Sequence, residues 1–145
     1  MMKRIYSALF ATALLALAMP ATAAVSQIEC PAEISSPSIQ IRHLPGWSAF
    51  VQYPLKLASA GMSAGPPGSL AVLRGSQLNS KNEAQSTRYE FSEVGFEKGK
   101  WLDCGYGEGS EITLSKRLDD NLKECTITYP PNRSRNWQKI TIACQ

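Results

Sequence analysis

The stretch Trp101-Leu102-Asp103-Cys104-Gly105-Tyr106-Gly107 decides the fold class of this chain. Neighbouring side chains of a β-strand point to opposite faces, so its leucine, cysteine and tyrosine share one apolar face. A second stretch, Cys125-Thr126-Ile127-Thr128-Tyr129, places its cysteine, isoleucine and tyrosine on one face in the same way. Cysteines on apolar strand faces predict an all-β fold, mainly antiparallel, built as a small sandwich or an open barrel and stapled by disulfides.

The first 23 residues have the features of a signal peptide. They begin with the basic pair Lys3-Arg4, continue with an apolar run too short to span a bilayer, and end on the small residues Ala21-Thr22-Ala23. Cleavage after these residues would leave one domain, residues 24–145. The sequence therefore predicts a soluble protein that is exported to the periplasm.

The net charge and the residues before Cys30 give no reason to expect nucleic acid or a membrane as the partner. Loss of the leader would remove two of the three excess positive charges, and a nearly neutral domain gives no electrostatic reason to bind nucleic acid. The residues before Cys30 are not the small apolar ones that precede a lipid-modified cysteine, so no membrane anchor is expected after cleavage.

All four cysteines lie in the expected domain, and an even number in an exported chain predicts two disulfides. Of the three possible pairings, we favour Cys104 with Cys125 and Cys30 with Cys144, the second of which would join the two ends of the domain. This pairing has a geometric difficulty. In a plain meander the first two cysteines would be about 10 Å apart, beyond disulfide reach, unless the sheet folds over or Cys125 lies past the middle strand.

Alternating side chains and turn residues predict the remaining elements. We expect strands at residues 38–42, 47–53, 87–91, 100–106, 111–118, 125–129 and 137–144, and no long helix. Residues 58–80 are rich in Gly, Ala, Ser and Pro, which predicts a long exposed loop with one short strand at residues 71–73. A loop this long in a compact domain is usually functional or mobile.

Several motifs follow one another through the expected domain. They are Cys30-Pro31, Gly46-Trp47, Gly65-Pro66-Pro67, Trp101-Leu102-Asp103-Cys104-Gly105-Tyr106, the stretch from Leu114 to Leu118, the stretch from Cys125 to Tyr129, and Ile142-Ala143-Cys144. In this order they resemble a family of small exported four-cysteine proteins of proteobacteria, of unassigned function. Some members of that family are encoded near toxin-delivery systems. The family more often has Arg where this chain has Gly105, so no role of that side chain is carried over.

Catalytic chemistry finds little support in the sequence, and we expect no catalytic residue, no metal and no cofactor. His43 is the only histidine, whereas a metal site needs several ligands and a catalytic triad needs an activated nucleophile. The acidic pairs Glu108/Glu111 and Asp119/Asp120 fall in polar turns with no apolar pocket to raise a pKa. The glycines of residues 105–109 are not accompanied by the lysine and the serine or threonine of a phosphate loop. They indicate a hairpin turn.

The candidate partner-binding residues come from the Gly/Pro loop and from the aromatic residues. Trp47, Trp101 and Trp137 could stack on a sugar or pack on the sheet, and the last two fall opposite the cysteines, where a protein interface could form. The Gly/Pro loop contains apolar residues and the cationic Arg74. The full set of candidates is Met62, Gly65, Pro66, Pro67, Leu70, Arg74, Trp101 and Trp137. The alternative is that the loop is a lid over the open end of the sheet.

These observations favour a non-catalytic periplasmic binding protein with a protein partner. An immunity protein or inhibitor that neutralises a cell-wall-degrading toxin enzyme is the first hypothesis, because a rigid stapled scaffold lowers the entropy cost of inserting a loop into a cleft. A lysozyme inhibitor is a close variant. An envelope structural or ligand-binding module without a protein target is the alternative from another class, and an enzyme ranks last.

Overall fold

The computed structural model describes residues 24–42, 44–78, 84–92, 95–131 and 139–145. The expected leader, His43 and Trp137 lie outside the described residues. The strands are β1 (Ser26–Ile28), β2 (Glu33–Ile34), β3 (Leu55–Ser63), β4 (Ser76–Leu78), β5 (Gln85–Glu90), β6 (Trp101–Tyr106), β7 (Ile112–Arg117), β8 (Glu124–Tyr129) and β9 (Thr141–Cys144), and a 3₁₀ turn, η1 (Ser36–Ser38), follows β2.

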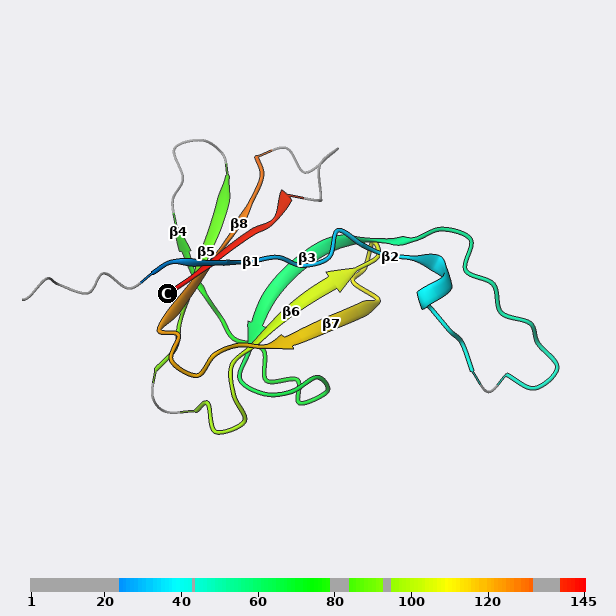
Figure 1. The fold of residues 1–145 in the computed structure, drawn as a ribbon, viewed down its shortest axis with the longest axis horizontal. Helices are drawn as coiled ribbons and strands as arrows, with labels where there is room; N and C mark the ends of the chain where they lie inside the picture. Colours follow the sequence, from blue (N-terminus) through cyan, green and yellow to red (C-terminus); the bar gives the residue numbers. More distant parts are fainter. Residues whose placement is uncertain (1–23, 43, 79–83, 93–94, 132–138) are drawn as a thin grey trace, which may run out of the picture.

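The strands form two antiparallel sheets, which confirms the all-β prediction (Figure 1). One sheet has the order β1-β9-β8-β5-β4 and the other the order β2-β3-β6-β7. Buried apolar side chains from both sheets pack into one core. The four-stranded sheet carries the candidate binding surface.

Strand β6 is the centre of the four-stranded sheet, between β3 and β7. Its side chains alternate as the sequence predicts: Leu102, Cys104 and Tyr106 are buried, whereas Trp101 before them and Asp103 among them are half-buried. The hydroxyl of Tyr106 donates a hydrogen bond to the Pro31 carbonyl at 2.9 Å. The outer face of this sheet is therefore the face that carries Asp103.

Strand β3 corrects the prediction of a loop over residues 58–80. Residues 58–63 belong to β3, the long partner of β6, where small side chains such as Ala60 and Gly61 oppose Cys104 and Asp103. In the described part of the stretch, the loop is confined to residues 64–75. In place of the expected strand at residues 71–73, a single bridge pairs Ser63 with Val72, and the strand that follows is β4.

The predicted disulfide pairing is wrong. Cys30 pairs with Cys104 and Cys125 with Cys144. Cys104 and Cys125 lie on different sheets, and Cys144 on β9 is the direct cross-strand partner of Cys125 on β8, with 4.1 Å between their Cα atoms. The plain meander considered for the favoured pairing does not occur, because the chain passes to the other sheet between β7 and β8. The other disulfide links the segment after β1 to the middle of the opposite sheet.

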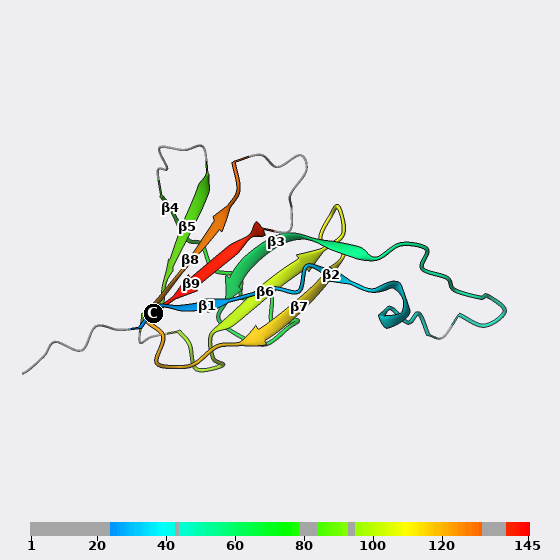
Figure 2. The same cartoon turned by 45° about the horizontal axis from the view of Figure 1, so that its top comes forward.

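The predicted strands at residues 38–42 and 47–53 are also absent. In the described part of this region the chain makes the turn η1 and then leaves the body as a long extension that returns at β3 (Figure 2). A strand needs a neighbour for its backbone groups, and this extension has none alongside it. The five later strands, β5 to β9, in contrast, lie within two residues of their predicted starts and one residue of their predicted ends, apart from the start of β9.

Candidate binding surface

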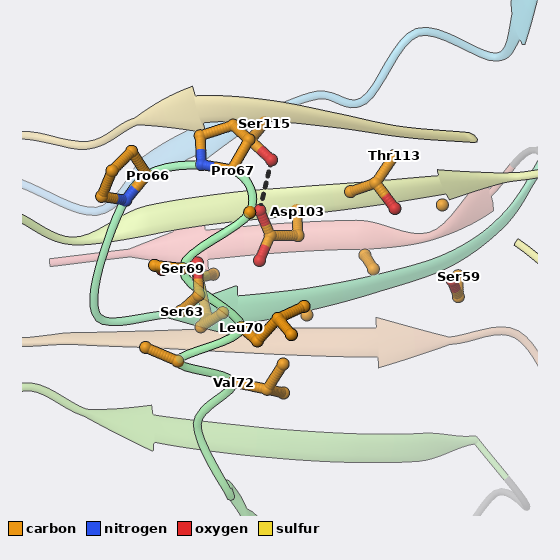
Figure 3. A pocket seen from close by; sticks show the side chains of 16 residues that line it. Ser59, Ser63, Pro66, Pro67, Ser69, Leu70, Val72, Asp103, Thr113 and Ser115 are labelled. Atoms are coloured by element: carbon orange, nitrogen blue, oxygen red, sulfur yellow. Dashed lines mark hydrogen bonds between the residues drawn. The ribbon is translucent and has the colours of Figure 1, made fainter. Parts of the chain in front are cut away.

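A hollow of about 320 Å³ opens on the outer face of the four-stranded sheet. Its floor consists of β3, β6 and β7, and the Gly/Pro loop that follows β3 forms its side (Figure 3). The polar side chains that line it are hydroxyls and one carboxylate: Ser59, Ser63, Ser69, Thr113, Ser115 and Asp103. This combination of a concave shape and a few polar groups is typical of a recognition surface.

Backbone hydrogen bonds fix the shape of the loop, which we define as residues 64–72. The Ala64 N–H donates to the Ala71 carbonyl at 2.9 Å, and the Ser69 N–H donates to the Pro66 carbonyl at 3.0 Å. Gly68 has a φ of +84°, as a turn after two prolines requires. The loop is therefore an ordered projection beside the sheet, and little entropy is lost when a partner binds it.

The loop presents two large apolar side chains to solvent. Leu70 is 88% exposed and Val72 is 74% exposed, and both line the hollow. Leu70 also has a φ of +53°, a conformation that costs a leucine about 1 to 2 kcal/mol. An exposed leucine on a strained backbone is a feature that stability alone does not explain.

Asp103 gives the hollow its charge. One of its oxygens, Oδ1, accepts a hydrogen bond from the Ser115 hydroxyl at 2.5 Å (Figure 3). Among the described residues no cation pairs with this carboxylate. The hollow therefore offers a negative charge to a positively charged group that enters it.

The predicted binding residues differ in where they lie relative to the hollow. Pro66, Pro67 and Leu70 line the hollow. Met62 borders it as well, but this residue belongs to the core and has no exposed surface. Arg74 is exposed but does not line the hollow.

Two further predicted residues, Gly65 and Trp101, do not line the hollow. Gly65 is buried, and a Cβ atom there would approach the Ser69 Oγ to 2.8 Å, so it permits the tight start of the loop. Trp101 is half-buried, and its indole donates to the Lys98 carbonyl at 3.0 Å outside the hollow. Trp137 lies outside the described residues.

Sequence reasoning missed Asp103 and Val72. The signal for Asp103 was present, because a carboxylate between Leu102 and Cys104 must face away from the core. Its position beside the loop depends on how the chain crosses the sheet, and no local pattern shows that.

The acidic residues of the predicted turns stabilise those turns. Glu111 accepts a hydrogen bond from the Gly109 N–H at 3.2 Å, and Asp119 accepts one from the Asn121 N–H at 2.8 Å. Asp120 forms an exposed ion pair with Arg117 at 3.0 Å. The described residues contain no group of histidine, cysteine and acidic side chains that could hold a metal ion.

A small two-sheet domain with two disulfides, a preformed hollow and exposed apolar side chains beside it defines a scaffold for binding another molecule. Residues 52–145 match the family described as Type VI secretion system Tli immunity protein. The match covers almost two thirds of the chain, which therefore belongs to this family. A search of curated proteins and a search of solved structures each found no match.

Membership of the family makes the chain an immunity protein whose partner is a toxin. The hypothesis of an immunity protein is confirmed, and the lysozyme-inhibitor variant is not favoured over it. The matched region contains the motifs from Gly65 onward, whereas Cys30-Pro31 and Gly46-Trp47 precede it, so the full motif series stays a prediction. In the part of the chain that the structure describes, no helix is long and apolar enough to cross a membrane.

Proposed function

We propose that this protein neutralises its toxin by binding it in the periplasm, without catalysis, and that the hollow on the four-stranded sheet receives part of the toxin surface. The single observation that carries the proposal is the hollow itself, in which an ordered loop holds Leu70 and Val72 beside the carboxylate of Asp103, which no cation among the described residues neutralises. Apolar side chains around a few placed polar groups are the usual lining of a concave binding site.

The charge of the hollow determines which toxin group fits it. A lysine or arginine side chain can enter beside the prolines of the loop, bury its aliphatic part against them and bring its cation to Asp103. The hydroxyls of Ser59 and Thr113, which also line the hollow, offer further hydrogen-bond partners. We expect a basic residue of the toxin at this position.

The periplasm is supported by the expected leader and by the two disulfides, which form and persist in oxidising compartments. A toxin in this compartment can attack the cell wall or the membrane lipids of the envelope. The sequence favoured a cell-wall-degrading toxin, and measurement of which of the two substrates the toxin degrades separates the possibilities.

A growth experiment tests the proposed function. A candidate toxin of the type VI secretion system, sought first among the genes adjacent to this one, is directed to the periplasm of a laboratory bacterium, together with the full-length protein or a form that lacks residues 1–23. We expect the full-length protein to restore growth and the leaderless form to fail. Failure of both forms, with the protein shown to be present in the periplasm, would contradict the proposal and favour an envelope module without a toxin target.

Variants of the hollow test, in the same growth experiment, whether the toxin binds there. Replacement of Asp103 by Lys should abolish protection, because a positive charge would then meet the expected cation of the toxin. The same reversal at Glu90, an exposed residue at the end of β5, is the matched control and should leave protection intact. Equal protection by both variants would show that the toxin binds elsewhere on the molecule.

A further inference from the structure

A long extension between β2 and β3 exposes a row of apolar side chains. We define the arm as residues 39–42 and 44–54; they protrude from the body at the end of the four-stranded sheet where β2 and β3 meet (Figures 1 and 2). Five large apolar residues on the arm are exposed, at every third position: Ile41, Leu44, Trp47, Phe50 and Tyr53. The last three are the most exposed of the five, at 81%, 86% and 70%. Contiguous exposed apolar surface of this kind marks an interaction site.

The structure holds the arm firmly at its root. Strands β2 and β3 pair through Glu33 with Lys56 and Ile34 with Leu55, and the Leu57 N–H donates to the Ala32 carbonyl at 2.9 Å. The disulfide of Cys30 fastens the same segment to β6. The exposed row therefore extends from a fixed base, which sets the direction in which it meets a partner.

Between its ends the backbone of the arm is almost unpaired. In the described residues from 40 to 54, the one backbone hydrogen bond runs from the Trp47 N–H to the Leu44 carbonyl, at 3.0 Å. The side chains bond only locally, Arg42 to Gln40 and Gln52 to Tyr53. The arm thus offers extended backbone with free donors and acceptors as well as apolar anchors.

We propose that the arm is a second docking element, which lies in an apolar cleft of the toxin with an acidic rim. This inference rests on the proposed function and adds a surface distinct from the hollow, since the arm leaves one end of β3 and the loop of the hollow leaves the other. The charge of the rim follows from the sequence. Between Glu33 and Glu83 there is no acidic residue, whereas Arg42 on the arm and Lys56 at its root are cationic and exposed.

The unpaired backbone favours a protein over a lipid surface as the occupant. In the hydrocarbon of a bilayer each unpaired backbone group costs several kcal/mol, roughly 2 to 7 kcal/mol by transfer measurements. A protein cleft or sheet edge can instead supply the missing hydrogen bonds, as in recognition by strand addition. Polar residues such as Gln40, Ser48 and Gln52, interspersed with the apolar ones, also fit a protein cleft better than a lipid interior.

The arm is also suited to distinguish one toxin from another. The family match begins at Gln52, so nearly the whole arm precedes the region that this chain shares with the family model. The hollow, in contrast, lies within the matched region. The arm supplies the contacts particular to this chain, and specificity between related toxins arises from such differences in contact.

The test is the affinity of the purified toxin, the one that this protein neutralises in the growth experiment, for variants of the full chain. Replacement of Trp47 and Phe50 together by Ser should weaken binding by about 100-fold or more, because aromatic side chains at the centre of an interface carry most of the affinity. Val25, which is 59% exposed away from the arm, provides the matched control, and its replacement by Ser should change affinity less than about threefold.

Two further measurements separate the possible outcomes. Backbone amides of the arm should exchange hydrogen rapidly in the free protein and become protected in the complex. If the wild-type protein binds the toxin and the arm variant binds equally well, the inference about the arm fails while the proposed function stands. If the wild-type protein binds no toxin, both fail.

A lipid occupant would be recognised separately. The wild-type protein and the arm variant are sedimented with vesicles of phosphatidylethanolamine and phosphatidylglycerol. We expect neither to sediment. Sedimentation of the wild-type protein alone, with toxin affinity unchanged in the variant, would overturn the inference and assign the arm to the membrane surface.

Discussion

The hydroxyl of Tyr129 on β8 makes two hydrogen bonds with the backbone of Ala60 on β3. It accepts one from the Ala60 N–H at 3.0 Å and donates one to the Ala60 carbonyl at 2.8 Å. The two residues belong to different sheets. They lie near the point where the register of β3 shifts between Leu57 and Ser59, so one side chain satisfies the backbone of an irregular strand and joins the sheets.

Replacement of Tyr129 by Phe tests this link. The change leaves both backbone groups of Ala60 without the tyrosine partner, and we expect a loss of about 1 to 3 kcal/mol in the free energy of unfolding. Denaturation by urea measures it. The control is replacement of Tyr53 by Phe, because that hydroxyl bonds only the exposed Gln52, and the midpoint should not move. Equal effects of the two changes would contradict the account.

The two disulfides should contribute unequally to stability. The bridge from Cys30 to Cys104 spans 74 residues, whereas that from Cys125 to Cys144 spans 19. Longer loops lose more entropy when they are closed, so loss of the first bridge should cost about 1 kcal/mol more than loss of the second, within a range of about 2 to 5 kcal/mol for each. Paired replacements by Ala, followed by thermal unfolding, measure the difference. Peptide mapping that links Cys104 to Cys125 would contradict the structure itself.

Stability should fall in alkaline solution. Burial raises the pKa of the Tyr106 phenol above its ordinary value of 10.0, and burial, followed by the nearby Tyr129, raises the pKa of Tyr89. Because the unfolded chain releases these protons at lower pH than the folded chain, this contribution is complete below about pH 10 and is lost as the pH rises through the folded pKa. Thermal unfolding over this range measures it. Replacement of Tyr106 by Phe should make the decline shallower, and an unchanged decline would count against this cause.

Leu70 allows the stability and the binding role of the loop to be separated. Glycine adopts positive φ readily, so Leu70→Gly should keep the loop conformation and leave the free energy of unfolding unchanged or raise it by up to about 1 kcal/mol. The same change removes an apolar anchor, so affinity for the toxin should fall by about tenfold or more. Calorimetry gives both values. A large loss of stability would mean that the loop is a lid over the sheet.

Much of the second half of the fold could be predicted because its strands carry the alternation that a one-sided core imposes. In β6 and β8 the cysteine and its apolar neighbours at every second position are buried or half-buried, as the pattern indicates. Short turns such as Asp119-Asp120-Asn121 separate the strands, and the side-chain bonds that stabilise these turns are local. Local signals therefore suffice there.

Strand β3 could not be predicted because several of its residues are small, which lets atoms of the neighbouring strands approach its backbone closely. Ala60 lies under the Tyr129 hydroxyl, and the Ser59 Oγ lies only 2.3 Å from where a Cβ atom on Gly105 would stand. Small residues are needed for such contacts, yet the same residues are typical of loops. The contacts that favour the strand come from β6 and β8, far away in the sequence.

The disulfides and the site depended on the same long-range information. The pairing of Cys125 with Cys144 follows from the register of β8 against β9, and the charge of the hollow follows from the position of the loop beside Asp103. The prolines and Leu70 were predicted from composition, but Met62, equally apolar, is buried at the end of the strand. Composition alone does not distinguish a buried core residue such as Met62 from an exposed residue of the following loop such as Leu70.

The affinity of the purified toxin for the wild-type protein and for Asp103→Lys, measured by titration calorimetry, tests the central claim most directly. The account predicts a complex with a dissociation constant of about 10 nM or tighter for the wild type, and at least about 100-fold weaker binding for the variant. The control Glu90→Lys should bind like the wild type. Absence of binding at micromolar concentrations, or the same affinity for all three proteins, would contradict the claim that this immunity protein receives its toxin in the hollow.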